Sequence, residues 1–111
     1  MYNTTQLQPQ GNFRVTNSSL QIFTQEELFC YREAKASLEQ MTIPGGMEIT
    51  LHATQYGWIA DIQPQEGSSC YHRRVTCWQG TFKGMRSSMS GAVSEIQCRH
   101  LPTALDYLLR G

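Results

Sequence analysis

The hydrophobic pattern changes its period once along the chain, and this change constrains the fold more than any other feature. Between residues 25 and 41, apolar side chains recur every three or four positions, which is the spacing of one helical face. From Met47 to Ala53, apolar and polar residues alternate, which is the spacing of a half-buried strand. Pro44-Gly45-Gly46 separates the two patterns and stops any continuation of the helix. The chain therefore combines helical and extended segments.

Local signals place the start of the helix at about Gln25. Thr24 and Glu27 form a capping box, in which each side chain accepts a hydrogen bond from a free backbone N–H of the first turn. The expected buried stripe consists of Leu28, Tyr31, Ala34, Leu38 and Met41.

The strand pattern reverses its parity after the first strand, since Trp58, Ala60 and Ile62 are the next apolar positions. A slip of one residue exchanges the two faces of a strand, so the chain must turn or bulge at Gly57. Residues 70–78 are rich in aromatic and β-branched side chains and predict another strand. Shorter extended segments are expected on either side of these strands, a hairpin or edge strand over 13–22 and a strand at 81–83.

The last third of the chain predicts two helices. Serines within residues 87–90 offer N-caps for a helix with Val93 and Ile96 on one face. Pro102 is expected to end that helix and to open a short final helix that docks through its leucines. The whole pattern predicts a single α+β domain with a three- to five-stranded antiparallel sheet packed by two or three helices. Double-stranded RNA-binding domains share this order of elements with many other small folds, and the order alone assigns no function.

Length and composition are those of one globular domain. The chain has 111 residues, 40% of them hydrophobic and 16% charged. Residues 1–12 are polar and uncharged, so we expect a flexible tail before a domain of residues 13–111. The expected core is Leu28, Tyr31, Leu38, Ile49, Leu51, Trp58, Ile62, Val75, Ile96, Leu105 and Leu108.

Neither a secretory signal nor an apolar run of about 20 residues occurs, so the expected location is the cytoplasm and no membrane contact is predicted. In a reducing compartment the cysteines are expected to be thiols. The expected assembly is a monomer or a small homo-oligomer.

Charge is distributed unevenly between two parts of the chain. Residues 1–69 carry three basic and seven acidic side chains, a balance of −4, and residues 70–111 carry six basic and two acidic ones, a balance of +4. This asymmetry indicates either a basic face for an anionic partner or two parts that neutralise each other across their contact.

The segment from Tyr71 to Trp78 places an arginine and an aromatic side chain on each face of its predicted strand. Arginine and aromatic residues are over-represented at the centres of protein interfaces, and they also stack on nucleobases. A buried Trp78 with a rim of solvated arginines is the third interpretation. We predict a small non-enzymatic binding or regulatory module that acts on a protein partner, with RNA or DNA binding as the alternative. The predicted contact residues are Tyr71, Arg73, Arg74, Trp78, Lys83 and Arg86.

Cysteine and histidine spacing predicts no metal site and no cofactor. Cys70 and His72, like Cys98 and His100, are two residues apart, whereas structural zinc sites use wider spacings. A thiol enzyme with Cys70 or Cys98 as nucleophile is the second alternative, since a nearby cation favours the thiolate. No local catalytic signature surrounds either cysteine, so no catalytic residue is assigned.

Overall fold

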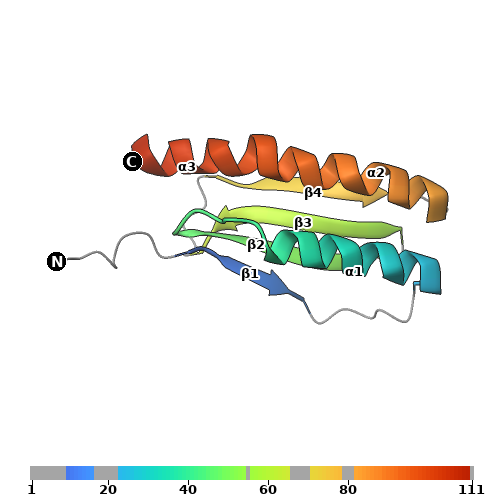
Figure 1. Cartoon of the computed structure of the whole chain (residues 1–111). Coiled ribbons are helices and arrows are strands. Elements are labelled where there is room, and N and C mark those ends of the chain that lie inside the picture. Colours follow the sequence, from blue (N-terminus) through green and yellow to red (C-terminus); the bar gives the residue numbers. More distant parts are fainter. Residues whose placement is uncertain (1–9, 17–22, 55, 66–70, 79–81, 111) are drawn as a thin grey trace.

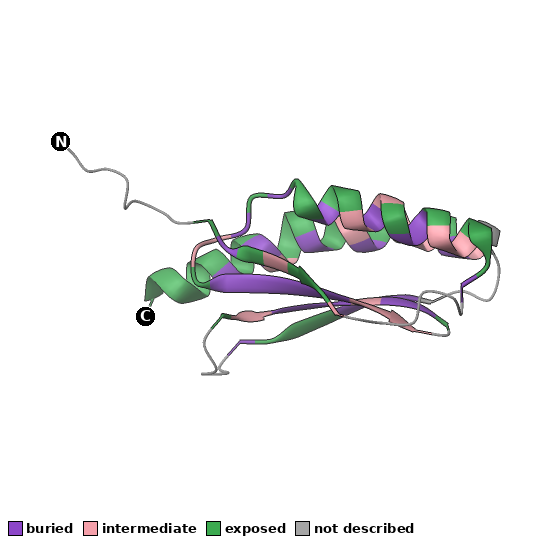
Figure 2. Cartoon of the chain, turned by 90° about the horizontal axis from the view of Figure 1, so that it is seen from below, coloured by how far each residue is buried: buried purple, intermediate pink, exposed green. Residues whose placement is uncertain are grey.

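The helical segments lie on one face of a four-stranded sheet (Figure 1). Viewed along the layers, the opposite face carries no helix in the part of the chain that the structure describes (Figure 2). The computed structural model describes residues 10–16, 23–54, 56–65, 71–78 and 82–110. Side chains are not described for Trp78, Phe82 and Lys83. The predicted class, a single α+β domain, is confirmed.

The four strands lie in sequence order across the sheet. They are β1 (Asn12–Val15), β2 (Met47–Thr54), β3 (Gly57–Pro64) and β4 (Arg73–Trp78). Strands β2, β3 and β4 are antiparallel, but β1 runs parallel to β2, so the sheet is mixed and the prediction of a purely antiparallel sheet is wrong at this strand. A parallel pair needs a crossover between its strands, and the helix between β1 and β2 provides it.

Strand β1 begins within the segment that the sequence assigned to a tail. The Gly11 N–H donates to the Ile43 carbonyl oxygen at 2.8 Å. A Cβ atom on Gly11 would collide with the carbonyl oxygens of Met47 and Pro44, so only glycine fits there. Residues 10–12 therefore belong to the fold, whereas residues 1–9 of the predicted tail lie outside the described residues. Of the expected edge segment 13–22, residues 17–22 also lie outside them.

Helix α1 (Gln25–Glu39) confirms the predicted helix and its capping box. The Glu27 N–H donates to Thr24 Oγ1 at 3.1 Å, and the Thr24 N–H donates to Glu27 Oε1 at 3.0 Å. The helix buries Cys30, Tyr31, Ala34 and Leu38 against the sheet.

Strands β2 and β3 form a hairpin in which Thr54 pairs with Gly57, so of the two predicted alternatives at Gly57, a turn or a bulge, the structure has the turn. Gly57 has a φ of 153°, a conformation that favours glycine. Farther along, Ile49 pairs with Ile62, and both side chains are fully buried under the helices. The reversal of parity in the sequence is thus the turn that keeps both apolar sets on the same face.

The C-terminal third is one uninterrupted helical rod in three parts (Figure 1). They are α2 (Phe82–Glu95), the π-helical segment η3 (Ile96–His100) and α3 (Leu101–Arg110). The predicted strand at 81–83 is therefore wrong for Phe82 and Lys83, and α2 begins before the serines that were expected to cap it. Met85, Ala92 and Ile96 explain this early start, because they are buried on one helical stripe.

Pro102 does not end the rod. The Leu101 N–H donates to the Ile96 carbonyl oxygen five residues back, which is the π-helical pattern. Proline lacks an N–H and its ring clashes with the preceding turn of an α-helix, so the wider turn before Pro102 accommodates it. Pro102 does lie in the first turn of α3, as predicted.

Most of the predicted core is buried, but Leu28 is only partly buried and the last two members are exposed. Leu105 and Leu108 are 45% and 37% exposed, so their assignment to the core is wrong. The physical reason is visible in Figure 2, where the last turns of α3 run beyond the end of the sheet. Within the described ranges, no helix combines the length and the apolar composition that crossing a membrane requires.

Candidate functional site

The predicted contact residues lie on separate surfaces. Arg74 lies on the helix-free face of the sheet, where it is opposite Asp61 in the register of β3 and β4. Tyr71 and Arg73 lie beside α3, and Arg86 lies in the helix layer against α1. For Trp78 and Lys83 the structure describes only the backbone, in β4 and α2, so their predicted contacts lie outside what it describes. The four of these residues whose side chains are described therefore lie on separate surfaces.

A polar cluster surrounds Asp61 on the helix-free face, and we call it the Asp61 cluster. Its members are His52 on β2, Asp61 on β3, Arg74 on β4 and His72 just before β4. Arg74 donates to both carboxylate oxygens of Asp61, at 2.8 and 3.1 Å. The Nε2 atoms of His52 and His72 lie 2.9 and 3.0 Å from the same two oxygens. One carboxylate thus holds three neighbouring strand segments together.

The electrostatics of the cluster favour an ionised Asp61. Burial raises the pKa of the Asp61 carboxyl, but the hydrogen bonds from Arg74, His72 and His52 outweigh it and hold the pKa below its usual range. An ionised carboxylate has no hydrogen to donate, so both imidazoles donate their Nε2–H to Asp61. The side chain of Asp61 is only 7% exposed, whereas those of Arg74 and His72 are 55% and 47% exposed.

The Asp61 cluster is better explained as an ion-pair network than as a metal centre. The guanidinium group of Arg74 already occupies both carboxylate oxygens. Among the described residues, no group of three or more His, Cys, Asp or Glu side chains has an arrangement that could hold a metal ion.

Tyr71 and Arg73 form a stack at the side of α3. The Arg73 guanidinium lies 5.1 Å from the centre of the Tyr71 ring, and the Tyr71 and Tyr107 rings lie 5.7 Å apart. The Tyr71 hydroxyl donates to the His100 carbonyl oxygen at 3.1 Å, at the end of the π-helical segment. Tyr71 is buried between Tyr107 of α3 and the Arg73 guanidinium, so its role is to position both side chains.

An apolar surface lies on the other side of α3, and we call it the α3 surface. It consists of the exposed leucines 105, 108 and 109 and the groove next to them. Leu109 is 77% exposed. The groove has a volume of about 790 Å³, and Met41, Ile43 and Pro44 form its opposite wall. A cluster of exposed leucines beside an apolar groove is the usual mark of an interaction site.

The uneven charge of the sequence is partly neutralised within the fold. Arg74 of the basic part pairs with Asp61 of the acidic part, and Arg86 donates to Glu33 at 2.8 Å across α2 and α1. The Arg86 guanidinium also lies over the Phe29 ring, at 5.3 Å. These pairs favour the interpretation in which the two parts of the chain neutralise each other.

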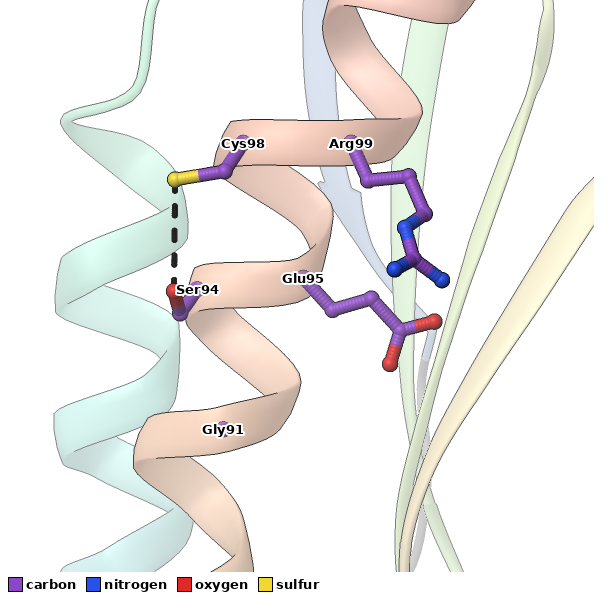
Figure 3. A pocket seen from close by; sticks show the side chains of 5 residues that line it. All are labelled: Gly91, Ser94, Glu95, Cys98 and Arg99. Atoms are coloured by element: carbon purple, nitrogen blue, oxygen red, sulfur yellow. Dashed lines mark hydrogen bonds between the residues drawn. The ribbon is translucent and has the colours of Figure 1, made fainter.

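The described cysteines differ in their access to solvent. Cys30 and Cys77 are buried, and burial raises the pKa of each thiol, which disfavours the reactive thiolate. Cys98 is exposed and lines a surface pocket of about 410 Å³ on the helical rod (Figure 3). Its sulfur lies 3.9 Å from Ser94 Oγ. Cys70 lies outside the described residues.

The pocket around Cys98 does not assemble a nucleophile and a base. In Figure 3 the Cys98 and Ser94 side chains point to one side of the helix, and the Glu95 and Arg99 side chains point to the other. The imidazole of His100 lies 2.8 Å from a carboxylate oxygen of Glu95 rather than beside the thiol. Within the described part of the chain, this geometry lends no support to a thiol enzyme that uses Cys98.

Two features of these surfaces were not foreseen from the sequence. The alternation of β2 and β3 places His52 and Asp61 on the polar face, so a signal for their proximity existed, but the register was needed to find it. The leucines of α3 were expected to dock on the rest of the domain. No sequence signal shows that α3 extends past the end of the sheet, as it does in Figure 2. Comparisons of the chain with family models, with curated proteins and with solved structures find no match.

Proposed function

We propose that this protein is a non-enzymatic binding module that docks an apolar helix of a protein partner on the α3 surface. The observation that carries the proposal is the exposure of the leucines 105, 108 and 109 beside the apolar wall of Met41 and Ile43. Clustered apolar side chains of this kind contribute to stability only when another surface covers them.

The shape and the chemistry of the groove favour a helix as its occupant. The groove runs between α3 and the segment of residues 40–45, and amphipathic helices commonly bind in grooves of this kind. Apart from its apolar wall, the groove is lined by uncharged polar side chains, which are Gln10, Gln40, Thr42 and Gln97. The partner therefore needs an apolar face rather than a charged one.

The Tyr71–Arg73 stack supports the same surface from its other side. Tyr107 belongs to α3 and packs against Tyr71, and the Arg73 guanidinium lies over the Tyr71 ring. Tyr71 and Arg73, two of the six contact residues predicted from the sequence, thus lie on the side of α3 away from its leucines, where they support the helix rather than contact the partner.

Photo-crosslinking at single positions tests this proposal directly. A photoreactive amino acid at position 109 should crosslink the full chain to a partner protein. The same group at position 103, an exposed site on the far side of α3, should not. Leu109→Glu should abolish capture of that partner, whereas Thr103→Glu should leave it unchanged. Equal crosslinking from positions 109 and 103 would rule out docking on the α3 surface.

The two alternatives have less support. Nucleic-acid binding needs free cations on one surface, and Arg74 and Arg86 are paired with carboxylates on different surfaces. A thiol enzyme would lose its activity when Cys98 is alkylated under native conditions, while the binding proposed here should survive that treatment.

A further inference from the structure

We propose that residues 1–9 of the same chain, which lie outside the described residues, cover the α3 surface by placing Leu7 in its groove. A protein partner then has to displace this N-terminal segment in order to dock. The inference rests on the proposed function, because it concerns the regulation of the same surface. It is supported by the place where the chain enters the fold, by the chemistry of residues 1–9 and by the reach of Leu7.

The chain enters the fold along one wall of the groove. Gln10 is itself one of the residues that line the groove. Its side-chain Nε2 donates to the Met41 carbonyl oxygen at 3.1 Å, and the Gly11 N–H donates to the Ile43 carbonyl oxygen at 2.8 Å. Met41 and Ile43 belong to the wall opposite α3, and Figure 1 shows β1 starting at the end of the sheet where α3 lies. The peptide bond to Gln10 therefore holds residues 1–9 at the groove.

The chemistry of residues 1–9 matches that of the groove. All the residues that line the groove are uncharged. Residues 1–9 likewise contain no Asp, Glu, Lys or Arg. Covering the groove with this segment therefore desolvates no charged side chain. Its amide and hydroxyl groups can exchange hydrogen bonds with Gln40, Thr42 and Gln97 of the lining, while Leu7 supplies an apolar side chain.

Leu7 lies within reach of the groove. Pro9 fixes its own φ near −65° and disfavours a helical Gln8, so the sequence favours an extended path of the polyproline II type. This conformation repeats every three residues, with a rise of about 9 Å per turn. On such a path Leu7 follows Gln10 on the same side of the segment, one turn away. That position brings Leu7 to the groove that the leucines of α3 line.

A tethered segment can cover the groove without a high intrinsic affinity. A short tether gives Leu7 an effective concentration on the order of millimolar at the groove. A partner binds only the fraction of molecules in which the groove is open, so the apparent affinity for the partner falls by that fraction. Residues 1–9 thus act as a competitor within the chain.

Photo-crosslinking within the purified full chain tests the contact. A photoreactive amino acid at position 109 should crosslink to residues 6–8, as located by mass spectrometry, in a product of monomer mass. Leu7→Glu should lower the yield of this crosslink roughly fivefold or more, because it places a carboxylate in an uncharged groove. Gln8→Glu is the matched control, since it adds the same charge on another side of the segment and should leave the yield nearly unchanged. Crosslinks that reach only Gln10 or the groove walls would overturn the inference.

A fluorescent dye tests whether the segment covers the leucines. Anilinonaphthalene sulfonate binds exposed apolar surface, so Leu7→Glu should raise its bound fluorescence roughly threefold over wild type, and Gln8→Glu should not. Adding Leu109→Glu to Leu7→Glu should remove this gain, whereas adding Thr103→Glu should keep it. Circular dichroism checks that each variant keeps its fold. Equal fluorescence of wild type and Leu7→Glu would show that residues 1–9 leave the α3 surface open.

The remaining outcomes separate this inference from the proposed function. A partner protein crosslinked from position 109, without any crosslink to residues 6–8, keeps the docking surface and overturns the inference. A crosslink to residues 6–8 with no partner protein, even for Leu7→Glu, keeps the contact within the chain and overturns both the proposed function and the regulation. A crosslinked product of dimer mass gives the groove to a second copy and overturns the inference.

Discussion

At the scale of single residues, Asp61 organises the helix-free face of the sheet. Its carboxylate accepts from Arg74 twice and from the imidazoles of His52 and His72. These partners come from segments that are distant in sequence, so the loss of one carboxylate releases three side chains at once. The Asp61 cluster contributes less to the free energy of unfolding than a fully buried ion pair would, because Arg74 and His72 are about half exposed.

Replacing Asp61 by Asn should lower the free energy of unfolding by about 1–3 kcal/mol, because a neutral amide cannot satisfy Arg74 and both imidazoles. Urea denaturation of the two proteins measures this difference. Glu33→Gln is the matched control, since the pair of Glu33 with Arg86 is more exposed and should be worth less than about 1 kcal/mol. Equal losses for the two variants would contradict a central role for Asp61.

The effect of Asp61 on stability should depend on pH. The pKa of its carboxyl is lower in the folded protein than in the unfolded chain, so the folded state holds the proton less tightly. The stabilisation is therefore complete above the unfolded pKa of about 4 and is lost as the pH falls through the folded value. The difference in unfolding free energy between wild type and Asp61→Asn should shrink in acid, and a difference independent of pH would show that the carboxylate charge is unimportant.

At the scale of elements, the C-terminal rod changes its role along its length. Met85, Ala92 and Ile96 attach α2 and the start of η3 to the core, whereas α3 keeps only Leu101 and Ala104 buried. The π-helical turn before Pro102 lies between these two parts. One continuous rod thus combines a packed half and a half that presents its leucines outward.

Truncating one leucine in each helix should separate these environments. Leu38→Ala, in the buried stripe of α1, should cost about 2–5 kcal/mol of unfolding free energy. Leu105→Ala should cost less than about 1 kcal/mol, since Leu105 is 45% exposed. Comparable losses for the two variants would mean that α3 packs more tightly than described.

Gly91 offers a stabilising change within α2. It is exposed, and a Cβ atom there would meet nothing within 4 Å. Gly91→Ala should therefore raise the free energy of unfolding by about 0.5–1 kcal/mol, because alanine restricts the unfolded chain and favours helix. Gly11→Ala is the opposite case and should be strongly destabilising, since its Cβ would collide with backbone carbonyls. Thermal unfolding of both variants provides the measurement.

At the scale of the whole molecule, the charge asymmetry of the sequence becomes a set of internal pairs. Arg74 and Arg86 are engaged with acidic residues of the first part of the chain, on opposite layers of the fold. The apolar α3 surface, rather than a basic face, is then the feature of the described exterior that these internal pairs leave unexplained. Because Arg74 and Arg86 are paired with carboxylates and the α3 surface is apolar, we prefer a protein partner to a nucleic acid.

Salt dependence separates these two classes of partner. A nucleic-acid complex that used Arg73, Arg74, Lys83 and Arg86 together would lose affinity with a slope of about −3 in log affinity against log salt. We expect no detectable binding to RNA or DNA at low salt, because at least two of these cations are already paired and lie on different surfaces. Fluorescence anisotropy with single- and double-stranded probes measures this, and a slope near −3 would contradict it.

Helix α1 and the β2–β3 hairpin were predictable from the sequence because local rules specify them. The capping box of Thr24 and Glu27, the helical period and the change of parity at Gly57 act within a few residues. The Asp61 cluster, the parallel course of β1 and the exposure of α3 depend instead on contacts between distant segments. A stripe of leucines has the same sequence pattern whether it packs in a core or binds a partner. For α3, only the position where the sheet ends determines which of the two occurs.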